Sequence, residues 1–319
     1  MSARLGCDLA ALLLAGGCAG PPSDRLAWSD TWEAVVAGHD GTVLVVRVTQ
    51  GNTGLLRGQA SLDVRVIPPA GSPLEMRRTA VPSDVTHDAE ARVVEVASDR
   101  VVHQEGTWTA LVREGPEALD ATVRLVSRAE PALPVVLDEG RRQRSVGAPM
   151  PLADAGGAWR SGIQGGTLDG RAVLVREAGD AWPDGRTRRE SLYLLGLERG
   201  VGVEILGDAR QAWTAGPRGT QTGRTARVRR NGRRLEVSLE PDLELSATVT
   251  LDRPTLTSRP WSDLTLLERP LACLLAGWPE RILERGEALV REPGRDPWTA
   301  AAVHVIRAGP RTGGASGRG

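Results

Sequence analysis

The stretch W-R-S-G-I-Q-G-G-T-L-D-G-R-A-V-L-V-R-E-A-G-D-A-W-P-D-G, from Trp159 to Gly185, decides how the rest of the chain is interpreted. It predicts a strand, a turn at Asp169-Gly170, a second strand and a loop with polar and aromatic groups. Asp-Gly between two β-rich runs favours a hairpin, because the turn needs a positive φ. We expect this hairpin to open a second β-domain, and a functional site, if there is one, to lie beside it.

Short strands and turns are predicted on both sides of this stretch. Residues 60–67, A-S-L-D-V-R-V-I, alternate apolar and charged side chains, which indicates a half-buried antiparallel strand. Asp40-Gly41 and Asn231-Gly232 mark two further hairpins. The sequence therefore predicts an all-β protein with two antiparallel β-barrel-like domains, residues 25–134 and 159–307. A linker over 135–158 and a disordered tail over 308–319 complete the expected division.

One segment departs from the strand pattern. From Ser262 to Gly277 the leucines follow helical spacing, and Ser262 can cap the start of a helix. We therefore expect a short helix near 262–277, either packed on the second barrel or dipping into a membrane.

Composition excludes some classes of protein. The 40 basic and 40 acidic residues give a net charge of zero, whereas a nucleic-acid binder needs a basic excess. No apolar run reaches 18 residues, so an ordinary transmembrane helix is not expected. The chain has nine Trp, one Tyr and no Phe, so the large rings of any core must come from tryptophan.

The first residues have the layout of a secretory signal. Arg4 supplies a positive charge, residues 9–15 are mainly apolar, and small residues precede Cys18. We expect residues 1–24 to be a signal peptide and tether, with Cys18 lipidated, so that the protein is extracytoplasmic and membrane-anchored. Ordinary secretion and an uncleaved cytosolic start remain open alternatives. The remaining Cys273 lies in an apolar stretch and is expected to be a buried thiol.

The order of these features resembles a lipocalin-like superfamily. Three stretches show the likeness: Asp40-Gly41 with the following strand and residues 51–54; residues 165–170 with Asp180-Ala181-Trp182-Pro183; and the strand 286–290. The superfamily includes hydroxyneurosporene synthase (carotenoid 1,2-hydratase), AttH-type proteins and the fungal survival-factor proteins. The resemblance implies two β-barrel-like domains and covers most of the chain from Trp28 to about Pro293.

The chain departs from the polar pattern of that superfamily. Its members commonly have His and Asp after the Gly-rich strand, where this sequence has Arg176 and Glu177 and no histidine. For alkene hydration, which needs a buried acid and aromatic rings, the candidate acids are Glu177 and Asp180, followed by Asp184 and Glu204. The candidate ligand-binding rings are Trp182, Trp159, Tyr193 and Trp213. No metal-ligand spacing is found, and no metal or cofactor is expected.

The resemblance and the expected envelope location favour a lipoprotein that binds a hydrophobic small molecule, such as a lipid or isoprenoid, in a barrel. One alternative is an isoprenoid hydratase or cyclase, a carbon–oxygen lyase type of enzyme. Another is a non-catalytic envelope scaffold with filled barrels. The expected partners are the small molecule and, through the lipid anchor, a membrane, but not nucleic acid; the sequence identifies no protein partner.

Overall fold

A computed structural model describes residues 28–51, 59–80, 85–88, 93–96, 98–104, 106–113, 119–138, 143–180, 189–207, 209–240, 243–252, 255–258 and 280–308. All regular structure in these ranges is β-strand. None of these residues belongs to a helix that could span a membrane. The predicted helix at 262–277, Cys18 and Cys273 lie outside the described residues.

The first sheet is built from the strands of the N-terminal half, all of them antiparallel to their neighbours. Its order is β4-β3-β2-β1-β12-β11-β9-β8-β7-β6-β5, and β10 pairs with β11 off this path. The strands are β1 (Trp28–Gly38), β2 (Val43–Gly51), β3 (Gln59–Ile67), β4 (Leu74–Ala80), β5 (Val85–Asp88), β6 (Val93–Val96), β7 (Asp99–Gln104), β8 (Thr107–Val112), β9 (Leu119–Ser127), β10 (Ala132–Asp138), β11 (Gln143–Ser161) and β12 (Gln164–Asp180).

The second sheet follows in the chain and is also antiparallel. Its order is β16-β15-β14-β13-β22-β21-β19-β18-β17, and β20 pairs with β21 off this path. The strands are β13 (Arg189–Leu195), β14 (Gly200–Leu206), β15 (Ala209–Gly216), β16 (Gly219–Gly223), β17 (Arg227–Asn231), β18 (Arg234–Ser238), β19 (Ser246–Leu251), β20 (Leu256–Ser258), β21 (Glu280–Arg291) and β22 (Trp298–Ala308).

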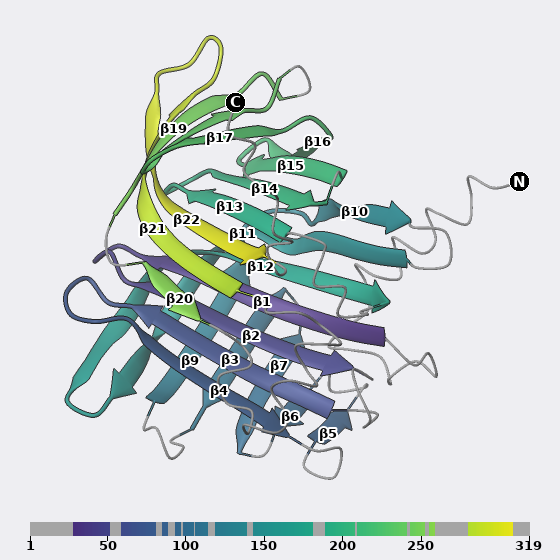
Figure 1. Ribbon diagram of the computed structural model, residues 1–319, viewed down its shortest axis with the longest axis vertical. Coiled ribbons are helices and arrows are strands. Elements are labelled where there is room, and N and C mark those ends of the chain that lie inside the picture. Colours follow the sequence, from purple (N-terminus) through teal and green to yellow (C-terminus); the bar gives the residue numbers. More distant parts are fainter. Residues whose placement is uncertain are drawn as a thin grey trace, which may run out of the picture.

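Each sheet curls around an apolar interior, and the two curled sheets are called here the first and second barrels (Figure 1). The first barrel encloses Trp32, Trp108 and Trp159 together with leucines, valines and alanines. The second encloses mainly Leu, Val and Ala side chains, including Leu192 and Leu235. Tryptophan therefore supplies the large rings of the first interior, as the composition predicts.

A third apolar cluster lies between the two barrels and joins them. In Figure 1 the second sheet stacks against the first, with β12 and β22 near the junction. Val35 and Val175 of the first sheet share this cluster with Tyr193, Trp213 and Val303 of the second. Because residues in a strand alternate between faces, β1 and β12 bury one face in the first barrel and the other against the second sheet.

Residues 159–180 are placed differently from the prediction. No turn occurs at Asp169-Gly170: β12 runs through it, and the hairpin turn falls at residues 162–163, between β11 and β12. A Cβ at position 170 would overlap the carbonyl oxygen of Ala37 on β1, so Gly170 allows close strand approach. The Asp40-Gly41 and Asn231-Gly232 turns are found as predicted.

The division between the two sheets also differs from the predicted boundaries. Residues 143–158, expected in a linker, form most of β11, and residues 164–180, expected in the second domain, form β12. Both strands pair within the first sheet. The Pro, Gly and Arg content of this region is typical of a linker, although the residues form an extended strand. The pairing of that strand with β12 shifts register between Gly147 and Met150 and between Met150 and Ala153.

Candidate functional site

The sequence-predicted site residues do not form one group. Trp159 is buried in the interior of the first barrel. Tyr193 and Trp213 lie together between the two sheets, with ring centroids 6.2 Å apart. Asp180 is the last residue of β12 and its side chain is outside the described part of the chain, as is all of Trp182.

Glu177 belongs to a network of charges buried between the sheets. Its carboxylate pairs with Arg144, Arg189 and Arg307. Arg307 also pairs with Glu33 of β1 and so links the two sheets. Three guanidinium groups around one carboxylate favour its ionised form. This arrangement suits a structural ion pair better than the protonated acid that alkene hydration requires.

Glu204, another candidate acid, lies in the same network and is also fully engaged. It accepts hydrogen bonds from Tyr193 Oη at 2.5 Å, from Ser191 Oγ at 2.7 Å and from Arg189 Nε at 3.0 Å. Burial, followed by the nearby Glu204 charge, raises the pKa of Tyr193 well above its usual value. The tyrosine therefore stays protonated as a donor to Glu204.

A different set of residues, not predicted from the sequence, has the geometry of an acid–base site. His304 of β22 is fully buried, and both of its ring nitrogens bond to carboxylates. Nδ1 lies 2.9 Å from Glu284 of β21, and Nε2 lies 3.0 Å from Glu190 of β13. Arg230 of β17 binds Glu284 through two hydrogen bonds of 2.9 and 2.8 Å. We call these four residues the histidine cluster.

Charge in the histidine cluster is balanced by these contacts. Burial opposes the charge on His304, but hydrogen bonds to Glu190 and Glu284 outweigh it and raise its pKa. Burial likewise would raise the pKa of Glu284, but its bonds to His304 and Arg230 lower it from 4.5 to about 2. An imidazolium that donates one hydrogen bond to each carboxylate is therefore the favoured state.

The strand register places the histidine cluster at one end of the second barrel. Glu190 pairs with Ile205 on one side and with Ile306 on the other, and Ile306 pairs with Ile282. Directly opposite residues in a sheet point to the same face. Two isoleucines thus flank Glu190, and a third, Ile282, lies one strand further along the same face. The Glu190 side chain is 15 % exposed, the Glu284 side chain 6 % and His304 is inaccessible, so Glu190 is the more accessible of the two carboxylates that bond to the imidazole, and Arg230, at 42 %, lies at the outer edge of the cluster.

Alternation along β22 was the available sequence signal for this site. In A-A-V-H-V-I, His304 occupies the face of Ala300, Ala302 and Ile306, so a buried histidine could be expected from the pattern. Its partners could not, because Glu190, Glu284 and Arg230 lie on three other strands whose register the sequence does not determine.

The opposite end of the second barrel is hollow. A cavity of about 1320 Å³ lies there, bordered by Leu243, Leu245 and Trp298 among others. The Trp298 indole donates to Glu292 at 3.1 Å, and Glu292 also pairs with Arg295. The size of this cavity exceeds that of sites for drug-sized ligands, roughly 300–1,000 Å³.

Comparisons with known proteins bear on the fold. No protein-family model matches the chain, and no curated protein matches it in sequence. Similar solved structures include CghA with Sch210972, at 12% identity and a TM-score of 0.61, covering 92% of this chain and 94% of that chain.

Two further structures are similar over comparable lengths. One is the AttH-type protein of Nitrosomonas europaea, at 14% identity and a TM-score of 0.58, covering 90% of this chain and 94% of the other. The second is kievitone hydratase of Nectria haematococca, at 8% identity and a TM-score of 0.59, covering 92% and 97%. The likeness predicted from sequence motifs is confirmed at the level of fold: the chain has the two-barrel, lipocalin-like architecture of these proteins.

Proposed function

We propose that this protein is an enzyme that transfers a proton to an apolar, unsaturated small molecule, in a hydration or cyclisation, at the histidine cluster. The observation that supports this most is His304, a buried imidazole whose two nitrogens bond to Glu190 and Glu284. Kievitone hydratase and CghA, the latter solved with Sch210972, share the fold at 8% and 12% identity. These two proteins support the proposal of a small organic substrate, but they do not support a role for any particular residue of this chain.

The proposed steps use groups on one barrel end. Glu190 receives a proton from His304 Nε2 and passes it to a carbon of the substrate double bond. In hydration, water adds to the resulting cation and loses a proton to Glu190, which returns it to His304. In cyclisation, the cation closes a ring and then loses a proton to the same carboxylate. Glu284 keeps the imidazole oriented throughout.

Two variants with a matched control test this function. Purified protein would be incubated with a panel of terpenoid alkenes in D₂O, and products analysed by mass spectrometry for added water or deuterium. Turnover by the intact protein should fall at least about 100-fold in Glu190→Gln and in His304→Gln. Glu198→Gln, an exposed carboxylate at the opposite end of the barrel, should leave it unchanged. Turnover that survives both substitutions would refute the proposed role of the cluster.

Binding of a lipid or isoprenoid without turnover is the second candidate. The observation that favours it is the cavity of about 1320 Å³ beside Trp298. Fatty acids and polyenes titrated into the protein should quench or shift tryptophan fluorescence, and Trp298→Ala should remove most of that change. Undiminished binding in that variant would place the ligand elsewhere.

The proposed location is the cell envelope, with Cys18 as the lipid attachment point. Support comes from the sequence alone: Arg4, the apolar residues 9–15 and the small residues before the cysteine. Full-length protein expressed in a bacterium should partition into the detergent phase of a phase-separation assay, and Cys18→Ala should partition into the aqueous phase. Aqueous partitioning of both proteins would refute the anchor.

A further inference from the structure

Between the two sheets, away from the histidine cluster, two donor atoms of one guanidinium are buried without a hydrogen-bond partner among the described residues. Arg47 of β2 points from the first sheet toward the second, on the same face as Val43 and Val45. Its Nε and Nη1 atoms are buried and have no hydrogen-bond partner among the described residues. An unsatisfied buried donor is costly, and a charged one more so, so such a group indicates a missing partner.

The surroundings of Arg47 carry an excess of positive charge. Burial first, and then the neighbouring Arg307 and Arg281, lower the pKa of Arg47 well below its usual value, although Glu33 and Asp63 oppose this. Five arginines and three carboxylates make up this part of the interface: Arg47, Arg65, Arg77, Arg281 and Arg307 with Glu33, Asp63 and Glu75. The arginines therefore outnumber the carboxylates by two. Adding the neighbouring network of two carboxylates and two arginines, Glu177, Glu204, Arg144 and Arg189, leaves this excess of two positive charges unchanged.

The carboxylates nearby are committed to other arginines. Asp63 pairs with Arg281 and Arg65, and Glu33 pairs with Arg307. One oxygen of each, Asp63 Oδ1 and Glu33 Oε1, is buried without a partner, yet neither reaches Arg47. Glu33 and Asp63 lie directly opposite Arg47 on the two neighbouring strands, but their pairing with other arginines leaves Arg47 Nε and Nη1 without an acceptor among the described residues.

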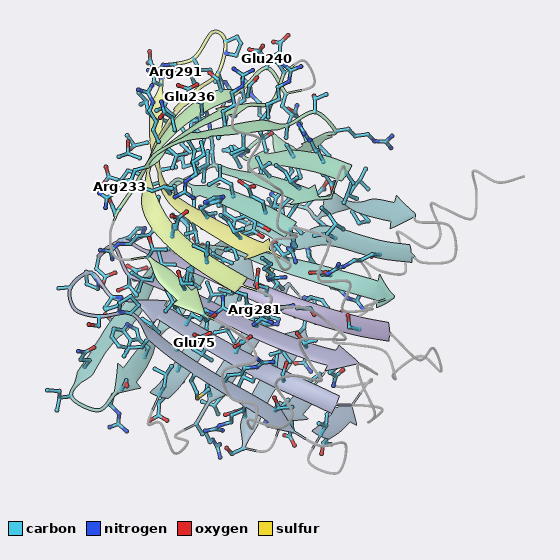
Figure 2. The ribbon with its side chains drawn as sticks, in the orientation of Figure 1. Glu75, Arg233, Glu236, Glu240, Arg281 and Arg291 are labelled. Atoms are coloured by element: carbon cyan, nitrogen blue, oxygen red, sulfur yellow. The ribbon has the colours of Figure 1, made fainter. Side chains whose placement is uncertain are left out.

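The position is close to solvent at the edge of the interface. Arg47 as a residue is only partly buried. Figure 2 shows Arg281 at the start of β21, near Glu75, where the second sheet overlies β3 and β4. Arg65 Nε donates a hydrogen bond to Glu75 at 3.1 Å, which places this ion pair at one side of the charged residues around Arg47. Because Nε and Nη1 are themselves buried, a small anion that enters from this edge must displace the side chains that cover them.

We propose that the Arg47 guanidinium, backed by Arg281 and Arg307, is a binding site for the carboxylate or phosphate group of a small molecule. A planar anion would accept from Nε and Nη1 together, which is the bidentate geometry that guanidinium groups offer. It would also neutralise part of the local positive excess. The site is separate from the histidine cluster, and its existence does not depend on the function proposed for that cluster.

Inorganic phosphate and acetate serve as probes, with chloride at matched ionic strength as the reference. Calorimetric titration and thermal unfolding of the full-length protein at pH 7 would measure the binding. Affinity for at least one of the two anions is expected, and which one binds decides between a phosphate and a carboxylate ligand. If neither anion binds or raises the unfolding temperature beyond the chloride reference, the donors of Arg47 are satisfied by water and the proposal is wrong.

Three variants identify the site. Arg47→Met should weaken anion binding about tenfold or more, because a charge-assisted pair of hydrogen bonds is lost. Arg160→Met, which removes an exposed arginine paired with Asp120, should bind as tightly as the unmodified protein. Asp63→Asn removes a competing negative charge and should tighten binding severalfold. That gain cannot arise from damaged folding, so it keeps the test decisive even if Arg47→Met does not fold; unchanged or weaker binding in Asp63→Asn would overturn the proposal.

Discussion

Replacing Glu33 by Gln should destabilise the protein by an amount that depends on pH. Burial alone would raise the pKa of Glu33, but the charges of Arg307, Arg189 and Arg47 lower it from 4.5 to about 2. Each unit by which a pKa is lowered on folding is worth about 1.36 kcal/mol, so Glu33 contributes about 3 kcal/mol of stability at neutral pH. The contribution is present above pH 4.5 and is lost as the pH falls toward 2.

Urea unfolding at several pH values between 7 and 2.5 measures this directly. The unfolding free energy of the unmodified protein minus that of Glu33→Gln should be about 3 kcal/mol at pH 7 and should shrink steadily below pH 4.5. Asp120→Asn, which removes a partly exposed carboxylate paired with Arg160, should show a difference below about 1 kcal/mol throughout. A Glu33→Gln difference that is the same at pH 7 and pH 3 would refute the argument that the charge on Glu33 joins the two sheets.

Three further substitutions test other parts of the structure. Gly170→Ala should cost about 2 kcal/mol or more, because the new Cβ overlaps the Ala37 carbonyl on β1; a loss below 0.5 kcal/mol would contradict that contact. Val303→Ala, in the cluster between the sheets, should cost about 2 kcal/mol, against less than 0.5 for exposed Val126→Ala. Because folding raises the pKa of His304, the contribution of its charge to the unfolding free energy should be complete below pH 6.5 and lost at higher pH. The difference in unfolding free energy between the unmodified protein and His304→Gln should therefore be larger at pH 6 than at pH 9.

Individual strands and turns could be predicted from the sequence, whereas the pairing between distant strands could not. Alternation in residues 60–67 and the turn at Asp40-Gly41 are local signals, and the structure confirms the antiparallel strand and the turn. The half-burial expected of that strand is wrong, because Asp63 and Arg65 are also buried and Asp63 pairs with Arg281 of the second sheet. The turn expected at Asp169-Gly170 was wrong because the same dipeptide serves another purpose: the glycine lets β12 pass close to β1. A residue type alone does not distinguish a turn from a close approach of two strands, since both require the absence of a Cβ.

The site was harder to predict, for a related reason. The sequence predicts Glu177, Glu204 and Tyr193 as candidates from their chemical groups alone. The structure does bring them together, but in ion pairs and hydrogen bonds between the sheets. No second histidine or cysteine lies near His304 in sequence, so spacing alone does not indicate a site there. Its partners come from β13 and β21, and only the pairing of distant strands brings carboxylates to both ring nitrogens.

The position of β12 limits how this chain can be divided or recombined. Since β12 completes the first sheet and also supplies part of the wall against the second, a cut at residue 134 would leave the first barrel without β11 and β12. A fragment that keeps the first sheet whole must extend to Asp180. Such a fragment would then expose Val173 and Val175 to water, so it should aggregate when expressed alone. The two barrels are therefore expected to be inherited and produced as one unit, despite their separate interiors.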